Sequence, residues 1–140
     1  MKDIIVGVDR SETARKAAER AAELAAAYRA NLHVVMCVDR GSSHEIVVGS
    51  DRFHTDWLTE AEMFLTDLAR TLPHDQVTHT VGLGDPAKML CEEASRLDAR
   101  AIVIGNRRVQ GVTRVLGSVA GDVTRQAPCD VVVAHTCAQC

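Results

Sequence analysis

The chain has 140 residues, of which 46% are hydrophobic and 25% charged, proportions that fit one globular domain and exclude a disordered, collagen-like or coiled-coil protein. Its 16 Lys and Arg against 19 Asp and Glu give a net charge of −3, so a general nucleic-acid-binding surface is not expected. No stretch approaches the roughly 18 apolar residues of a membrane span, and the N-terminus turns charged too early for a signal peptide, so we expect a cytoplasmic protein without a membrane partner.

The chain opens with a strand followed by a helix rich in alanine. Residues 3–8 (DIIVGV) form a continuous apolar run, typical of a strand buried on both faces of a parallel sheet. Ser11 is the expected N-cap of the helix that follows, with Glu12 in its first turn. Residues at helical spacing predict its inward face: Ala14, Ala17, Ala18, Ala21, Ala25 and Tyr28. Such small side chains let the helix lie close to its sheet, which explains part of the low aromatic content of 3%.

Four further strands are predicted along the chain. Apolar or alternating runs of strand length occupy residues 32–38, 76–81, 101–104 and 130–135. Between the first two of them, the polar stretch 39–51 is the longest candidate loop.

Three more helices separate these strands. An apolar stripe at helical spacing runs from Trp57 to Leu72 and ends at Pro73. The next helix has Asp85 as its expected cap and Pro86 at its first position. The last helix is expected over 118–126.

Strict alternation of strands and helices predicts one doubly wound α/β domain over residues 1–136, with residues 137–140 as a short tail. In such a sheet, ligands bind beyond the carboxyl ends of the strands, where the strand order reverses. Two predicted strands have residues suited to ligand binding at their carboxyl ends. The first strand ends in Val8-Asp9, and the fourth leads into the glycine-rich segment from Gly105 to Ser118. Glycine backbone, a helix N-terminus and the Ser118 hydroxyl together suit a phosphate group.

Five segments carry a resemblance to a known family: IIVGVDRSE near the N-terminus, GDPA at 84–87, AIVIGN at 101–106, LGSVA at 116–120, and APCDVVV near the end. From Ile4 to Val133 the chain resembles the universal stress protein family. The resemblance implies a five-stranded parallel sheet of order 3-2-1-4-5 with helices on both faces, and a homodimer through the last strand, residues 130–135. It also implies ATP, with or without Mg2+, or another adenine nucleotide, between the first and fourth strands.

The resemblance also implies the binding residues. The family's adenine contacts fall on Val8, Asp9 and Val38, and its phosphate and ribose contacts on Gly105, Arg108, Gly117, Ser118 and Val119. The family's pattern is Gly, two residues, Gly, nine residues, Gly, then Ser or Thr. This chain has Arg108 at the second glycine and eight residues before the third, and it has Arg10 where the family usually has Gly.

The altered loop leaves two interpretations open. Arg108 weakens binding if glycine is needed for close backbone approach, and the chain is then an interaction module that has lost its nucleotide. Alternatively, Arg107, Arg108 and Arg114 supply guanidinium groups to a triphosphate and Gly111 takes over the missing turn. The leading hypothesis is a dimeric ATP-binding stress-response protein, with segments 39–51 and 106–116 ordered by the nucleotide.

The sequence shows no recognisable catalytic motif, because it contains neither a Ser-His-Asp arrangement nor a metal-binding histidine pair. Any ATP hydrolysis is therefore expected to be slow. The histidines are expected at surface or strand positions. Cys137 and Cys140 form a CxxC pair, but its place at the chain end favours an incidental tail over a zinc or redox site. Asp9 also has a plainer interpretation, as a polar residue at the entry of the first helix.

Overall fold

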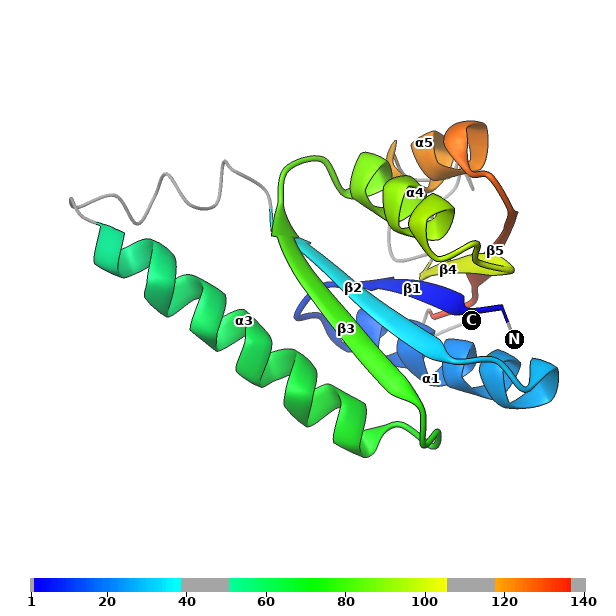
Figure 1. Ribbon diagram of the computed structural model, residues 1–140, viewed down its shortest axis with the longest axis horizontal. Helices are drawn as coiled ribbons and strands as arrows, with labels where there is room; N and C mark the ends of the chain where they lie inside the picture. The colour runs from blue at the N-terminus through cyan, green and yellow to red at the C-terminus, as the bar shows by residue number, and fades with distance from the viewer. Residues whose placement is uncertain (1, 39–50, 106–117, 137–140) are drawn as a thin grey trace.

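The computed structural model describes residues 2–38, 51–105 and 118–136, with only the helical backbone for 51–57 and 118. Within these ranges strands and helices alternate (Figure 1): β1 (Ile4–Val8), α1 (Glu12–Tyr28), β2 (Leu32–Val38), α3 (Asp51–Thr71), β3 (Val77–Leu83), α4 (Pro86–Arg96), β4 (Ala101–Gly105), α5 (Ser118–Gln126) and β5 (Asp130–Ala134).

The strands form one parallel sheet in the order β3-β2-β1-β4-β5. The predicted fold class and strand order are therefore confirmed. The chain moves outward from β1 through β2 to β3, then returns across the sheet to β4 on the other side of β1. The strand order thus reverses between β1 and β4, the place where ligands bind in sheets of this kind.

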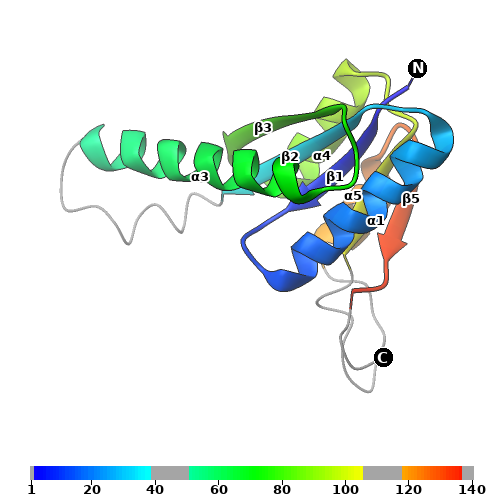
Figure 2. The ribbon, with the colours of Figure 1, turned by 90° about the horizontal axis from the view of Figure 1, so that it is seen from below.

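Two helical layers cover the sheet. Side chains from α1 and α3 share one buried cluster with Ile4, Val6 and Val34, whereas side chains from α4 and α5 share a second cluster with Ile5 and Val35. Figures 1 and 2 show the same arrangement, with α1 and α3 on one face and α4 and α5 on the other. Neighbouring residues of β1 and β2 therefore point to opposite apolar layers, which explains why these strands read as continuous apolar runs.

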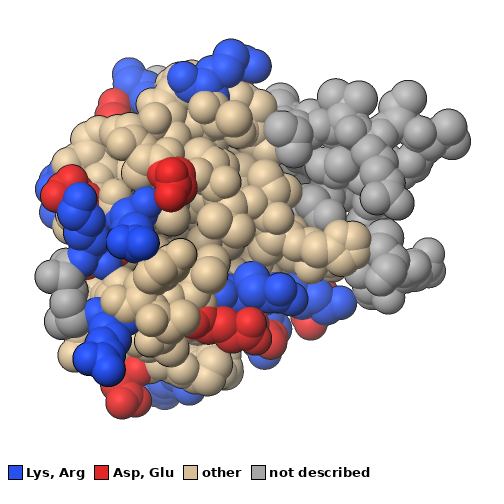
Figure 3. All heavy atoms as spheres, turned by 90° about the vertical axis from the view of Figure 1, so that its right-hand side faces the viewer, with Lys and Arg blue, Asp and Glu red and all other residues tan. Residues whose placement is uncertain are grey.

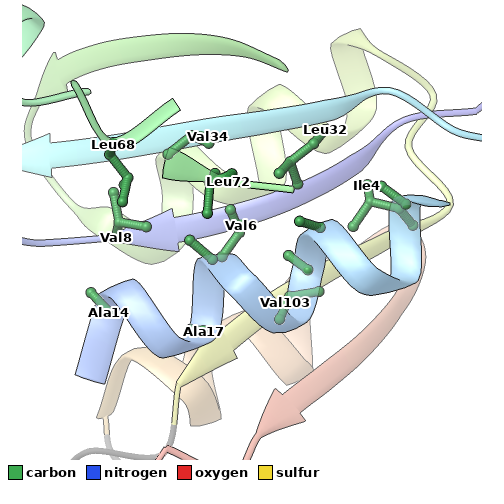
Figure 4. Close-up of a cluster of buried hydrophobic side chains, with 14 of the residues drawn as sticks. Ile4, Val6, Val8, Ala14, Ala17, Leu32, Val34, Leu68, Leu72 and Val103 are labelled. Atoms are coloured by element: carbon green, nitrogen blue, oxygen red, sulfur yellow. The ribbon is translucent and has the colours of Figure 1, made fainter. Parts of the chain in front are cut away.

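Helix α1 forms as the sequence predicts. Ser11 is its N-cap, and the Ser11 hydroxyl accepts a hydrogen bond from the backbone N–H of Ala14. Six alanines of α1 are buried: Ala14, Ala17, Ala18, Ala21, Ala22 and Ala25. In Figure 4 the alanines of α1 lie against Val6 and Val103 without any large side chain between helix and sheet. The alanine face therefore sets the short spacing between α1 and the strands.

The inward orientation predicted for Tyr28 is wrong. Tyr28 is 49% exposed, and its ring lies against the Arg100 guanidinium at 4.0 Å from the ring centroid. Tyr28 is the last residue of α1, beyond Ala25, the last of the buried alanines that pack against the sheet. Its cation–π contact gives the ring a partner at the surface.

Two element boundaries differ from the sequence prediction by two or more residues, and one expected cap lacks its side-chain hydrogen bond. Helix α3 begins at Asp51, within the segment expected to be a loop. The sequence analysis missed this start because the first turns of the helix carry no apolar stripe. Strand β3 continues past residue 81 to Leu83, since it pairs with β2 as far as Val38. Asp85 occupies the N-cap position of α4, but its side chain makes no capping hydrogen bond. Among the described helices, none has the length and apolar character that crossing a membrane requires.

Candidate functional site

The candidate site lies at the carboxyl ends of β1 and β4. The two strands pair in register from Ile4 opposite Ala101 to Val6 opposite Val103, so their last residues, Val8 and Gly105, end at the same level. We call the ends of these strands and the segments that leave them the carboxyl edge. Val8 is 6% exposed and belongs to the buried cluster beneath this edge.

Asp9 follows β1 and is exposed. Its Oδ1 accepts a hydrogen bond from the backbone N–H of Ser11 at 2.8 Å, and the Ser11 hydroxyl lies 3.0 Å from that of Thr13. The carboxylate is therefore held by the turn that starts α1. This geometry is compatible with Asp9 as a residue of the helix entry and with Asp9 as an adenine contact, because a carboxylate has two oxygens and several acceptor positions.

Val38 ends β2 on the neighbouring side of β1. β2 runs two residues further than β1, since Val8 pairs with Met36. The backbone N–H of Gly84 donates to the carbonyl oxygen of Val38 at 3.1 Å, and the Cys37 thiol donates to the carbonyl of Gly84 at 3.2 Å. Gly84 has a φ of 129°, a conformation that side chains other than glycine's rarely adopt. The turn before α4 thus fixes Val38 at the carboxyl edge.

Gly105 is not required by the packing of the described residues around it. A Cβ built there would lie 3.4 Å from the Thr136 side chain and 3.6 Å from Cβ of Ala17, which are ordinary van der Waals contacts. Its φ is also outside the left-handed region. The described neighbours of Gly105 therefore leave room for a Cβ at this position.

The last part of the site begins where the described structure resumes. α5 starts at Ser118, and its N-terminus supplies the partial positive charge of a helix end. Val119 is half-buried and packs on the second core cluster. The remaining predicted contacts lie outside the described residues: Arg107, Arg108, Gly111 and Gly117. The same holds for Arg114, for segments 39–50 and 106–116, and for the pair Cys137 and Cys140.

A second polar cluster lies at the opposite, amino-terminal edge of the sheet. His33 in β2 is 5% exposed, with Nδ1 2.6 Å from the Thr78 hydroxyl and Nε2 3.0 Å from Oε2 of Glu93 in α4. Nε2 also lies 2.9 Å from the Thr80 hydroxyl, and Arg96 donates two hydrogen bonds to Glu93. Because an ionised carboxylate only accepts, Nε2 of His33 donates to Glu93 and Nδ1 accepts from Thr78.

The sequence analysis missed the His33 cluster. His33 is the second residue of the run LHVVMCV, which predicts a strand. A buried imidazole requires hydrogen-bond partners, so a histidine within a predicted strand was the signal that could have indicated a polar cluster. His33 of β2 contacts Thr78 of β3 and Glu93 of α4, so the cluster connects these three elements. It lies at the edge of the sheet opposite Asp9 and Gly105 and is therefore not part of the candidate site.

The His33 cluster predicts loss of stability in acid. Burial lowers the pKa of His33 below its ordinary 6.5, outweighing the contrary effects of the hydrogen bond and charge of Glu93. The hydrogen bond from Arg96 lowers the pKa of Glu93, although burial opposes it. In both cases the unfolded chain binds protons at a higher pH than the folded chain does. The free energy of unfolding is thus expected to fall as the pH drops below about 6.5, and further below about 4.5.

Urea denaturation at several pH values measures this dependence. His33→Gln removes the titrating imidazole, so the decline that begins near pH 6.5 should flatten while the lower decline due to Glu93 persists. His74→Gln is the matched control, because the His74 ring makes its hydrogen bond to the carbonyl oxygen of Ala30, outside the cluster. An equal slope in wild type and His33→Gln between about pH 7 and 5.5 would show that His33 does not cause the acid sensitivity.

Among the described side chains, no three His, Cys, Asp or Glu residues are grouped in a way that could hold a metal ion. The described polar groups at the carboxyl edge include the Asp9 carboxylate, held by the backbone N–H of Ser11, and the N-terminus of α5. A carboxylate accepts hydrogen bonds and a helix N-terminus favours an anion, so these groups suit a ligand that carries both a donor and an anionic group.

Comparison with known proteins covers nearly the whole chain. The model of the universal stress protein family matches residues 1–135. Universal stress protein A homolog 1 of Coxiella burnetii is 31% identical over 137 residues, which are 93% of each chain. A crystal structure of a universal stress protein in complex with cAMP has a TM-score of 0.70 at 28% identity, covering 97% of this chain and 98% of its own. The universal stress protein of Archaeoglobus fulgidus in complex with dAMP has a TM-score of 0.69 at 25% identity, covering 95% and 97%.

Proposed function

The chain belongs to the universal stress protein family, and from this premise we propose that it binds an adenine nucleotide at the carboxyl edge between β1 and β4. The observation that carries the proposal is the reversal of strand order there, with Val8-Asp9 and Gly105 ending side by side. Two structural neighbours that were solved in complex with cAMP and with dAMP support the class of ligand. We propose ATP with Mg2+ as the nucleotide of this chain.

Each part of the nucleotide has a partner in this proposal. Val8 and Val38 flank the adenine ring, and the Asp9 carboxylate accepts from its exocyclic amine, the hydrogen-bond donor of that base edge. Gly105 and the N-terminus of α5 at Ser118 and Val119 receive ribose and phosphate. In this proposal Arg107 and Arg108 add guanidinium groups to the phosphates, and Gly117 is a further phosphate or ribose contact; these residues and Gly111 lie outside the described ranges.

We propose that binding, rather than catalysis, is the activity. The sequence contains neither a Ser-His-Asp arrangement nor a metal-binding histidine pair that would mark a dedicated catalytic site. The nucleotide would order the segments around it and present a changed surface to a protein partner. Any ATP hydrolysis is slow in this proposal, because the sequence marks no metal-binding carboxylate or base beyond Asp9.

Calorimetric titration with ATP and Mg2+ tests the proposal. We expect saturable heat with one nucleotide per chain, and thermal stabilisation that reaches about 2.7 kcal/mol when the free nucleotide is a hundred times its Kd. No heat and no shift of the melting temperature at millimolar ATP, cAMP or dAMP would contradict nucleotide binding. That result would favour the alternative, an interaction module whose altered loop at Arg108 has lost the nucleotide.

We also propose that two copies pair through β5. β5 is an edge of the sheet with Val133 38% exposed and Val131 and Val132 half-buried, and an uncovered apolar edge strand invites pairing. Figure 3 views the side on which β5 and α5 lie in Figure 1, and shows a central area without Lys, Arg, Asp or Glu, with charged side chains above, below and to its left.

Analytical ultracentrifugation of variants at the two sheet edges tests the dimer. Val133→Lys places a charge on β5 and is expected to weaken dimerisation at least about tenfold, since a desolvated unpaired charge is costly at an interface. Leu83→Lys is the control, because Leu83 is 45% exposed on β3, the other edge strand. A Val133→Lys protein as dimeric as the wild type, or a wild type that is monomeric, would contradict pairing through β5.

A further inference from the structure

Arg10 makes a connection that the nucleotide site itself does not explain. It lies between Asp9 and the helix cap Ser11, and its side chain extends to α3. Its Nη2 is 3.9 Å from Oε2 of Glu60, and its guanidinium lies over the Phe64 ring at 5.9 Å from the centroid. Glu60 and Phe64 are one helical turn apart, so a single side chain contacts the same face of α3 twice.

These contacts fall where α3 leaves the core. Among the side chains of α3 that the structure describes, the buried ones are Ala61, Leu65 and Leu68, and Leu72 directly after the helix is buried with them. Residues 58–60, just before Ala61, are exposed, and Phe64 is only partly buried. Figures 1 and 2 show the first half of α3 extending past the sheet. Arg10 thus contacts α3 beside Ala61, the first buried residue among the described side chains of this helix.

We propose that Arg10 is a positioning residue that couples the nucleotide-binding turn after β1 to α3, so that occupancy of the carboxyl edge changes the order of that helix. The inference rests on the proposed nucleotide binding. A base bound to Asp9 restrains the turn that carries Arg10, and a restrained turn favours the contacts with Glu60 and Phe64. Coupling of this kind is reciprocal and needs no change of backbone structure.

The coupling is expected to be modest, because the partners are exposed. The side chains of Arg10 and Glu60 are 52% and 68% exposed, so solvent screens the ion pair. Charge alone does not distinguish this pair from others on the surface. What distinguishes it is position, since it joins the residue next to Asp9 to a helix 50 residues further along the chain.

Hydrogen exchange of the full chain, with and without saturating ATP and Mg2+, tests the coupling. In the wild type, ATP is expected to slow exchange of amides around residues 60–64 about threefold, a change in keeping with one exposed ion pair and one cation–π contact. Arg10→Ala should abolish that slowing even at ATP concentrations that calorimetry shows to saturate the variant. Arg20→Ala is the matched control, since Arg20 pairs with Glu23 within α1 at 3.5 Å.

A reversed pair separates coupling from a general loss of structure. Arg10→Glu alone should abolish the slowing at α3, and combining it with Glu60→Arg should restore at least part of it. Slowing at α3 that survives Arg10→Ala, or its absence in wild type that binds ATP, would overturn the coupling and leave the proposed function intact. Absence of ATP binding by the wild type would overturn the proposed function and the coupling together.

Discussion

Asp9→Asn is expected to weaken ATP binding about ten- to a hundredfold, which corresponds to losing one hydrogen bond to a charged acceptor. The substitution preserves the shape of the side chain. An Asn oxygen can still accept from the backbone N–H of Ser11, as Oδ1 of Asp9 does at 2.8 Å, so the turn before α1 keeps its support. The remaining atom then becomes an NH2 group, which faces the adenine amine as donor against donor.

Asp75→Asn is the matched control for this substitution. Asp75 is exposed just before β3, at the edge of the sheet opposite the proposed nucleotide. Calorimetry should give wild-type affinity for Asp75→Asn and a melting temperature close to wild type for both variants. If Asp9→Asn binds ATP as tightly as the wild type does, Asp9 is only a residue of the helix entry, and the proposed orientation of the base is wrong.

Ala21→Leu is expected to lower the free energy of unfolding by about 2 to 3 kcal/mol, because it inserts extra carbons into a filled interface. Ala21 is fully buried on α1, within the cluster that includes Ile4, Val6 and Val103. A leucine there must push α1 away from the sheet or adopt a strained rotamer. Alanine and leucine differ little in helix propensity, so the loss reports packing.

Ala26→Leu provides the comparison on the same helix. Ala26 is exposed, so the same added carbons meet solvent, and its stability should stay within about 0.5 kcal/mol of wild type. Urea denaturation measures both variants under identical conditions. Equal stability of Ala21→Leu and Ala26→Leu would contradict a close alanine interface between α1 and the sheet.

Much of the fold could be predicted because local and tertiary signals agree. Strand β1, Ile4–Val8, is apolar on both faces and is covered by both helical layers, and Ser11 caps α1 as its side-chain chemistry indicates. The errors lie where tertiary contacts decide. Tyr28 stays at the surface because Arg100, distant in sequence, lies against its ring. The start of α3 carries no apolar stripe, so periodicity could not find it.

The candidate site divides in the same way. Strand ends are predictable from the chain order, and the structure places Val8, Asp9, Val38 and Gly105 at the carboxyl edge. The binding roles given to them remain predictions. Contacts between distant segments could not be predicted, since they depend on how helices lie on the sheet. Arg10 reaching Glu60 is one such contact, and His33 meeting Glu93 is another.

The most direct test of the central proposal is an amide NMR titration of the wild-type protein with ATP and Mg2+. Nucleotide binding between β1 and β4 predicts that the largest shift changes fall on residues 8–11, Val38, Gly105 and the first turn of α5, all at the carboxyl edge. Amides around His33 and Thr78, at the opposite edge, should change little. Unchanged spectra at millimolar ATP, or largest changes around His33, would contradict the proposed site.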